Sequence, residues 1–149
     1  MRFWDTCAIV PLLVSEPKTA TMKTLHGADA DLVTWWGTRA ECVSALNRRR
    51  REGSLSSKDL ENARALLDHL SGNWAEMQPT DRIRALAERF IDTHPLKAAD
   101  AMQLAAAYRW AVEQPSGYEF VSLDRQLRKA ANSEGFTVLP TDAAMNRDL

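Results

Sequence analysis

The sequence predicts a single α/β domain in which a parallel β-sheet is flanked by α-helices. The length of 149 residues is that of one average domain. A composition of 45% hydrophobic and 26% charged residues is typical of a globular protein. Short apolar runs alternate with longer segments of helical periodicity, which favours strand–helix units and hence parallel strands. We expect residues 1–140 to form the domain and residues 141–149 to form a polar C-terminal tail.

Five short segments are expected to form the strands. The clearest are residues 31–36 (DLVTWW) and 118–123 (YEFVSL), because both are rich in β-branched and aromatic residues. In chain order, the expected strands cover residues 2–4, 31–36, 74–78, 118–123 and 137–139.

The segments between the strands have helical periodicity, and start and stop signals bound them. Ser56 and Ser57 can cap a helix whose leucines recur at amphipathic spacing. His94 precedes Pro95 and therefore ends a helix, because the residue before proline avoids the helical region. The longest helix is expected over residues 97–113. In chain order, the expected helices cover residues 6–13, 18–25, 38–51, 57–70, 80–91, 97–113 and 124–132.

Charge and cysteine content exclude several classes of protein. The 19 basic and 20 acidic residues give a net charge of −1, whereas whole-surface binding of nucleic acid usually needs a pI above about 9. A local basic patch is still compatible with this balance. Cys7 and Cys42 lack the spacing of a metal finger, and we expect small, buried, reduced thiols.

The chain carries no sign of a secretory or membrane segment. Asp5 falls where a secretory apolar region would begin, and Pro11 interrupts the next apolar stretch. No run approaches the roughly 20 apolar residues that cross a membrane. A soluble, cytoplasmic protein without membrane association is expected.

Three acidic residues stand at or just after predicted strand ends. Asp5 closes the first strand, Asp124 closes residues 118–123, and Glu41 lies in the first turn of the helix after residues 31–36. Ligands of open α/β sheets bind outside the carboxyl ends of the strands, so these acids could converge on one cleft. Each also suits a helix cap: Asp5 and Asp124 as N-caps, and Glu41 as the partner of Thr38 in a capping box.

Asp100 is harder to explain as a cap, because it lies inside the predicted helix over residues 97–113. Leu96 and Leu104 lie about one turn away on either side. A carboxylate on an apolar stripe is costly to bury unless it is paired or bound to a metal. Lys97 is a possible ion-pair partner, but we favour an Asp100 side chain that points into the same cleft.

Four carboxylates with few other ligands suit a hard divalent cation, Mg²⁺ or Mn²⁺. The three histidines, His26, His69 and His94, lack zinc-ligand spacing. Glycine-rich phosphate loops and a GxSxG nucleophile motif are absent, which excludes P-loop, dinucleotide-binding and serine-hydrolase classes. An all-carboxylate magnesium site most often performs phosphoryl chemistry.

Four segments resemble, in order, the motifs of the PIN-domain ribonucleases, most closely the VapC-like toxins of toxin–antitoxin pairs. The segments are FWDTCAIVPLL, TRAECVSAL, LKAADAMQLAAA and FVSLDRQLRKAANSEGF. The residues that they place in the family's motifs are Asp5, Thr6, Glu41, Asp100, Ser122 and Asp124. Two small departures are Cys7, where a serine is common, and Ser122, where a threonine is common.

The resemblance implies a PIN fold and a metal-dependent endoribonuclease. Asp5 and Asp100 would bind Mg²⁺ or Mn²⁺ directly, and the cation would activate water for attack on a phosphodiester. Glu41 and Asp124 would complete the metal site, orient waters or act as the general base. Hydrogen bonds from Thr6 and Ser122 would support them. The family also implies an RNA substrate, a cognate antitoxin protein and a homodimer or higher oligomer.

The run Arg48, Arg49, Arg50 and Arg51 ends the helix that carries Glu41. Cations at a helix C-terminus complement the helix dipole, and such a run is usually solvated. The functional alternative is contact with RNA phosphates on the approach to the acidic cleft.

A different class of function stays open as the alternative. A PIN-like module without catalysis would act as an RNA- or protein-binding scaffold, although the presence of all four acids argues against it. A receiver-type phospho-acceptor is disfavoured because Asp5 lacks an acidic neighbour and Lys129 falls inside a helix.

Overall fold

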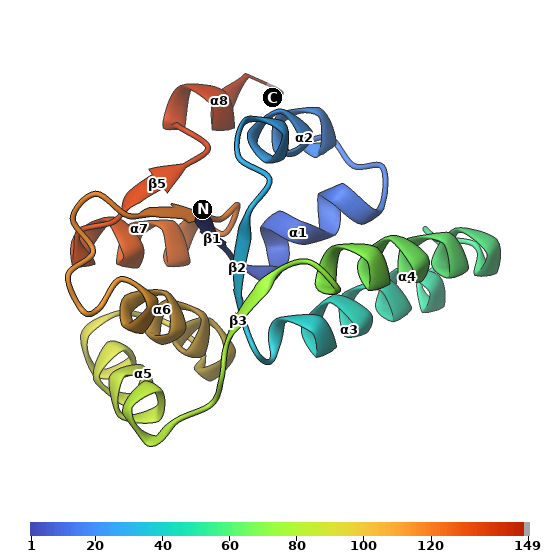
Figure 1. The fold of residues 1–149 in the computed structure, drawn as a ribbon. Helices are drawn as coiled ribbons and strands as arrows, with labels where there is room; N and C mark the ends of the chain where they lie inside the picture. The colour runs from blue at the N-terminus through green and yellow to red at the C-terminus, as the bar shows by residue number, and fades with distance from the viewer. Residues whose placement is uncertain (148–149) are drawn as a thin grey trace.

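The computed structural model describes residues 1–147. Its core is a five-stranded parallel sheet with the strand order β3-β2-β1-β4-β5 (Figure 1). The predicted α/β class is therefore confirmed. The strands are β1 (Arg2–Trp4), β2 (Leu32–Trp35), β3 (Ala75–Met77), β4 (Glu119–Val121) and β5 (Thr137–Leu139). Each lies within a segment expected to be a strand.

The helices follow the predicted order, with one addition near the C-terminus. They are α1 (Thr6–Leu13), α2 (Thr19–Ala28), α3 (Thr38–Arg51), α4 (Ser57–Ser71), α5 (Asp81–Thr93), α6 (Ala98–Trp110), α7 (Arg125–Glu134) and α8 (Asp142–Asn146). Helix α8 lies within the segment expected to be a polar tail, of which residues 148–149 are outside the described part of the chain. The domain boundary at residue 140 stays a prediction.

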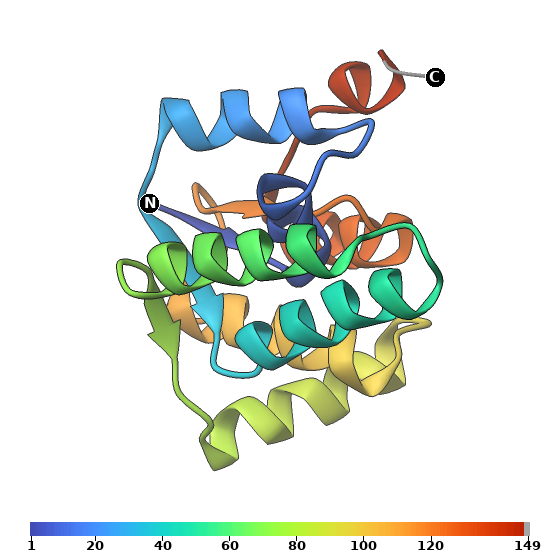
Figure 2. The same cartoon turned by 90° about the vertical axis from the view of Figure 1, so that its right-hand side faces the viewer.

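Two apolar clusters cover the two faces of the sheet. Phe3 and Phe120 belong to the cluster beneath α5, α6 and α7, whereas Trp4 and Val121 belong to the cluster beneath α1, α3 and α4. Neighbouring residues of a strand point to opposite faces, so both faces of these central strands are buried. The two views show the corresponding helix layers, with α3 and α4 side by side (Figure 2). Because these central strands are buried on both faces, a ligand can reach them only at their ends.

The prediction of the longest helix was wrong. Helix α6 has 13 residues and begins at Ala98, whereas α4 has 15. The chain leaves the helical conformation after Trp110, because Val112 and Glu113 adopt positive φ angles of 55° and 59°. Asp100 lies in the first turn of α6 and not in its interior.

Within residues 1–147, no helix is both long enough and apolar enough to cross a membrane.

Candidate active site

A cleft of about 580 Å³ opens beside the carboxyl ends of β1 and β4. The chain runs outward from β1 to β2 and β3 on one side, then returns to β4 and β5 on the other. The boundary between β1 and β4 is thus the topological switch point, where open α/β sheets bind ligands. All four acids singled out in the sequence line this cleft: Asp5, Glu41, Asp100 and Asp124.

Asp5 is buried at the end of β1, with only 3% of its surface exposed. One oxygen, Oδ1, caps α1 by accepting a hydrogen bond from the Ala8 N–H at 3.1 Å. The other, Oδ2, accepts one from the Ser122 hydroxyl at 2.8 Å, and the Cys7 thiol lies 3.1 Å from both oxygens. Burial raises the pKa of Asp5 to about 7, and the charge of Asp100 adds to this, against the lowering effect of the hydrogen bonds. Asp5 is therefore a helix cap whose ionised form is disfavoured by burial.

Asp124 occupies the equivalent position after β4. Its Oδ1 caps α7 by accepting a hydrogen bond from the Leu127 N–H at 2.8 Å. Its own N–H donates to the Ser122 hydroxyl at 3.1 Å, so Ser122 connects the two acids. Asp124 Oδ2 makes no hydrogen bond within the described residues, which leaves it available to a ligand.

The capping-box interpretation of Glu41 was wrong. Helix α3 has Gly37 as its N-cap, without a side-chain hydrogen bond, so Thr38 is the first residue inside the helix. Glu41 instead accepts hydrogen bonds from the Thr6 hydroxyl at 3.2 Å and from the Gln103 amide at 3.2 Å. Burial and the charge of Asp100 raise its pKa, although both hydrogen bonds oppose the shift.

Gln103 is a residue of the site that no sequence pattern singled out. Its side chain is 1% exposed, and its amide nitrogen lies 3.0 Å from both the Thr6 and Thr38 hydroxyls. It follows Asp100 by three residues, so the two share a face of α6. A polar residue one turn from an acid in an alanine-rich helix was the available signal. Gln103 joins α1, α3 and α6 around Glu41.

Asp100 is partly buried in the cleft wall. Burial raises its pKa, the charge of Asp124 adds to the shift, and Lys97 opposes it. In the part of the chain that the structure describes, no ion pair joins Asp100 to Lys97, so the salt-bridge alternative is not supported. A position in the first turn of α6 does stabilise an acid through the helix dipole.

The four arginines at the end of α3 have different surroundings. Arg48 and Arg49 line the cleft, whereas Arg50 and Arg51 are exposed elsewhere. Arg49 pairs with Glu16 across the cleft wall, with 2.6 Å between Arg49 Nη2 and Glu16 Oε1. Arg48 is exposed and therefore the better candidate for phosphate contact.

The two cysteines have different surroundings. Cys42 is fully buried, and burial raises its pKa to about 12. Cys7 is partly buried in the cleft, where burial and the neighbouring Asp5 raise the pKa of its thiol well above the usual range. Both are therefore protonated thiols, and neither is a reactive thiolate.

The donor set of the cleft fits a hard divalent cation. Among residues 1–147, no three histidine, cysteine or acidic side chains are assembled to hold a metal ion. Mg²⁺, however, usually keeps several waters and binds through only one or two carboxylates. The raised pKa values of Asp5, Glu41 and Asp100, each with another acid among its causes, indicate negative charge that a bound cation would relieve.

A parallel sheet with an acid-lined cleft at its switch point places this domain in the open-sheet α/β class. The chain matches the PIN domain model over residues 2–142 and belongs to the PIN-domain family. The resemblance seen in the sequence motifs is thereby confirmed.

One relative and two solved structures illustrate the match. Ribonuclease VapC47 of Mycobacterium tuberculosis (strain CDC 1551 / Oshkosh) is 32% identical over 141 residues, which cover 91% of this chain and 93% of that protein. The crystal structure of M. tuberculosis VapC20, a Sarcin-Ricin loop cleaving toxin, has a TM-score of 0.66 and 20% identity over 92% of this chain and 97% of that one. The crystal structure of FitAcB from Neisseria gonorrhoeae has a TM-score of 0.64 and 17% identity. The match covers 93% of this chain and 96% of that one. The two crystal structures show the shared fold.

Proposed function

We propose that this protein is a metal-dependent endoribonuclease that hydrolyses RNA phosphodiester bonds. One observation carries the proposal: four carboxylates from four separate segments of the chain line a single cleft at the switch point of the sheet. Asp5 and Asp124 precede α1 and α7, whereas Glu41 and Asp100 lie in the first turns of α3 and α6. The similarity to ribonuclease VapC47 supports RNA as the substrate class.

Asp5 and Asp100 are proposed to hold Mg²⁺ or Mn²⁺, with Glu41 and Asp124 completing the site. The cation, when bound, supplies positive charge that stabilises a phosphodiester under attack and activates water. Glu41 is the proposed general base, because Asp5 and Asp100 are assigned to the cation and burial raises the pKa of Glu41 above that of an exposed glutamate. The Thr6 hydroxyl and the Gln103 amide hold its carboxylate in place.

The cleavage test uses total RNA and the purified protein, with Mg²⁺ or with a chelator, followed by sequencing of the new RNA ends. Wild type is expected to make new ends only with the metal. Asp5→Asn and Asp100→Asn are expected to abolish cleavage, because an amide keeps the shape and loses the charge that the cation needs. Asp92→Asn, an exposed change on α5, is the control. RNA binding without new ends would favour the alternative, a catalytically inactive binding module.

We further propose that the protein is the cytoplasmic toxin of a toxin–antitoxin pair and that it acts as a homodimer or higher oligomer. A cognate antitoxin would silence it by covering the acidic cleft, where an inserted arginine could form a bidentate contact with a carboxylate. If a neighbouring gene encodes a small protein, co-expression with that protein is expected to form a complex and restore growth. If neither occurs, the toxin proposal fails while the nuclease proposal stands.

A further inference from the structure

Arg128 of α7 is the only buried lysine or arginine in the described part of the chain, with 9% of the residue exposed. Burial of a cation is costly unless hydrogen bonds replace its hydration. The next residue on the same helix, Lys129, is exposed. The placement of Arg128 therefore needs a structural reason.

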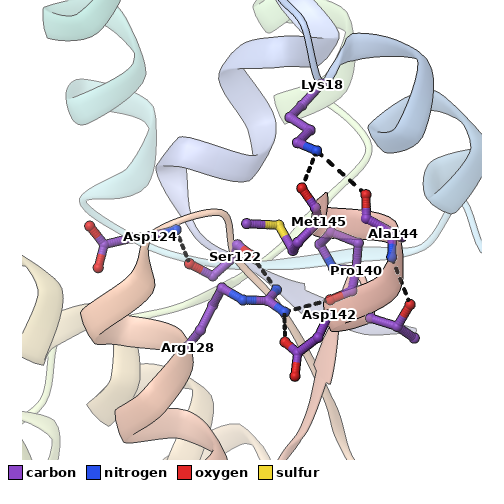
Figure 3. A network of polar contacts seen from close by, with 9 residues as sticks. Lys18, Ser122, Asp124, Arg128, Pro140, Asp142, Ala144 and Met145 are labelled. Atoms are coloured by element: carbon purple, nitrogen blue, oxygen red, sulfur yellow. Dashed lines mark hydrogen bonds and ion pairs between the residues drawn. The ribbon is translucent and has the colours of Figure 1, made fainter. Parts of the chain in front are cut away.

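The guanidinium of Arg128 joins two segments that follow neighbouring strands (Figure 3). Nη1 donates to the Ser122 carbonyl at 2.9 Å, and Nη2 donates to the Pro140 carbonyl at 2.7 Å and to Asp142 Oδ1 at 3.1 Å. The Asp142 side chain is 98% exposed, so this ion pair contributes little. The main partners are the two carbonyls, and bridging them requires the rigid fork of arginine.

Ser122, whose carbonyl accepts from Arg128, also contacts two acids of the cleft. The hydroxyl of the same residue donates to Asp5 at 2.8 Å and accepts the Asp124 N–H at 3.1 Å. Arg128 therefore bonds both Pro140, in the segment after β5, and Ser122, and Ser122 in turn bonds two of the four acids. Arg128 itself does not line the cleft.

A second cation holds the same C-terminal segment from the opposite side. Lys18 Nζ donates to the Met145 carbonyl at 2.5 Å and to the Ala144 carbonyl at 3.4 Å (Figure 3). Lys18 lies two residues after Glu16, which lines the cleft. The segment that Arg128 bonds is thus itself held in place, so it can serve as a fixed support.

We propose that Arg128 is a positioning residue for the acidic cleft. By bonding the Ser122 carbonyl to the docked C-terminal segment, it fixes the Ser122 hydroxyl between Asp5 and Asp124. The proposal rests on the proposed function in one respect, that these acids bind a divalent cation. Loss of the fork leaves all four acids present but places Asp5 and Asp124 less well for that cation.

The first test measures Mn²⁺ binding by calorimetry for wild type, Arg128→Lys and Arg128→Met, well below each melting temperature. The dissociation constant is expected to rise about tenfold in Arg128→Met, as for other residues that orient metal ligands. Arg128→Lys is expected to be intermediate, because an ammonium can still reach one carbonyl. Lys129→Met, an exposed neighbour with the same charge change, is expected to match wild type.

This measurement separates positioning from simple loss of stability. Well below its melting temperature, a variant that is only less stable is almost entirely folded, so its dissociation constant would equal that of wild type. An unchanged constant in both Arg128 variants would overturn the proposal. If Arg128→Met does not fold, Arg128→Lys alone decides.

A second measurement is independent of the nuclease proposal. Hydrogen exchange of the Asp124 N–H, in chelator, reports the bond to the Ser122 hydroxyl. Exchange is expected to be faster in Arg128→Lys than in wild type or Lys129→Met. Equal exchange rates would overturn the positioning role whether or not the protein cleaves RNA. Failure of wild type to bind Mn²⁺ would instead count against the proposed function.

Discussion

The Ser122 hydroxyl donates a hydrogen bond of 2.8 Å to Asp5 Oδ2, across a sequence separation of 117 residues. The bond joins the ends of β1 and β4, which are paired in parallel. Asp5 receives further hydrogen bonds from the Ala8 N–H and the Cys7 thiol, yet burial still dominates its pKa. Its ionised form in the absence of metal is therefore costly.

The stability of the metal-free protein is expected to depend on pH through Asp5. The pKa is about 7 in the folded protein and 3.8 for an unperturbed group, so the folded state binds more protons between these values. The Asp5 contribution is therefore fully present below pH 3.8 and is lost as the pH rises to about 7. The free energy of unfolding of wild type relative to Asp5→Asn, measured by urea titration in chelator, should fall across this window. A pH-independent difference would contradict the prediction, and Asp92→Asn controls for the loss of a carboxylate.

Glu41→Gln is expected to abolish cleavage while the protein stays folded. The amide removes a partly buried charge and retains an oxygen that can accept from Thr6, but its NH2 group replaces the oxygen that accepts from Gln103. The free energy of unfolding should therefore change by no more than about 2 kcal/mol. Loss of a general base is expected to lower kcat by at least about 100-fold. Glu52→Gln at the C-terminal end of the same helix is the matched control. Equal cleavage rates for the two variants would show that Glu41 only supports the local structure.

The fold and the acids were predictable because both follow from local sequence features. Alternating strand and helix patterns predict the parallel sheet, and the residues that close its strands necessarily meet at one edge. Asp5 and Asp124 satisfy both interpretations given to them, since the junction of a strand and a helix is at once a cap position and the mouth of the cleft.

The parts that escaped prediction depend on contacts between distant segments. Gln103 bonds Thr6 across 97 residues, and periodicity does not encode which helix face meets which neighbour. The Arg128 contact with Pro140 depends likewise on how α7 and β5 pack. The bounds expected for α3 were right, but its N-cap is Gly37 rather than Thr38, so the capping box suggested by the sequence is absent.

The two halves of the arginine run are expected to differ in their effect on RNA binding. Arg48→Gln should weaken binding across RNA sequences and reduce the slope of log affinity against log salt by about 0.7, the value for one phosphate contact with a single strand. Arg51→Gln, with the same charge change on the same helix, should leave both quantities unchanged, because Arg51 does not line the cleft. Fluorescence titration of a labelled RNA at several salt concentrations measures both, in an Asp100→Asn background to prevent cleavage. An equal effect of the two changes would indicate general electrostatic attraction rather than a contact at the cleft.

Asp100→Asn is expected to raise the melting temperature of the metal-free protein while it abolishes cleavage. Burial and the charge of Asp124 both disfavour the ionised Asp100 side chain in the folded state, so a neutral amide relieves an unfavourable interaction. Because Asp100 is only partly buried, solvent screening limits the increase in the free energy of unfolding to about 1 kcal/mol. The loss of a favourable helix-dipole interaction in the first turn of α6 reduces it further. The expected rise is therefore at most about 2–4 °C.

The same substitution should shrink the stabilisation that millimolar Mn²⁺ produces in wild type, since only binding to the native state shifts the melt. Thermal melts of wild type, Asp100→Asn and the exposed control Asp92→Asn, each with chelator and with Mn²⁺, measure both effects. A lower melting temperature for Asp100→Asn in chelator would show that the acid stabilises the start of α6. An unchanged response to Mn²⁺ would remove Asp100 from the proposed metal ligands, because a carboxylate that binds the cation cannot be lost without weakening that binding.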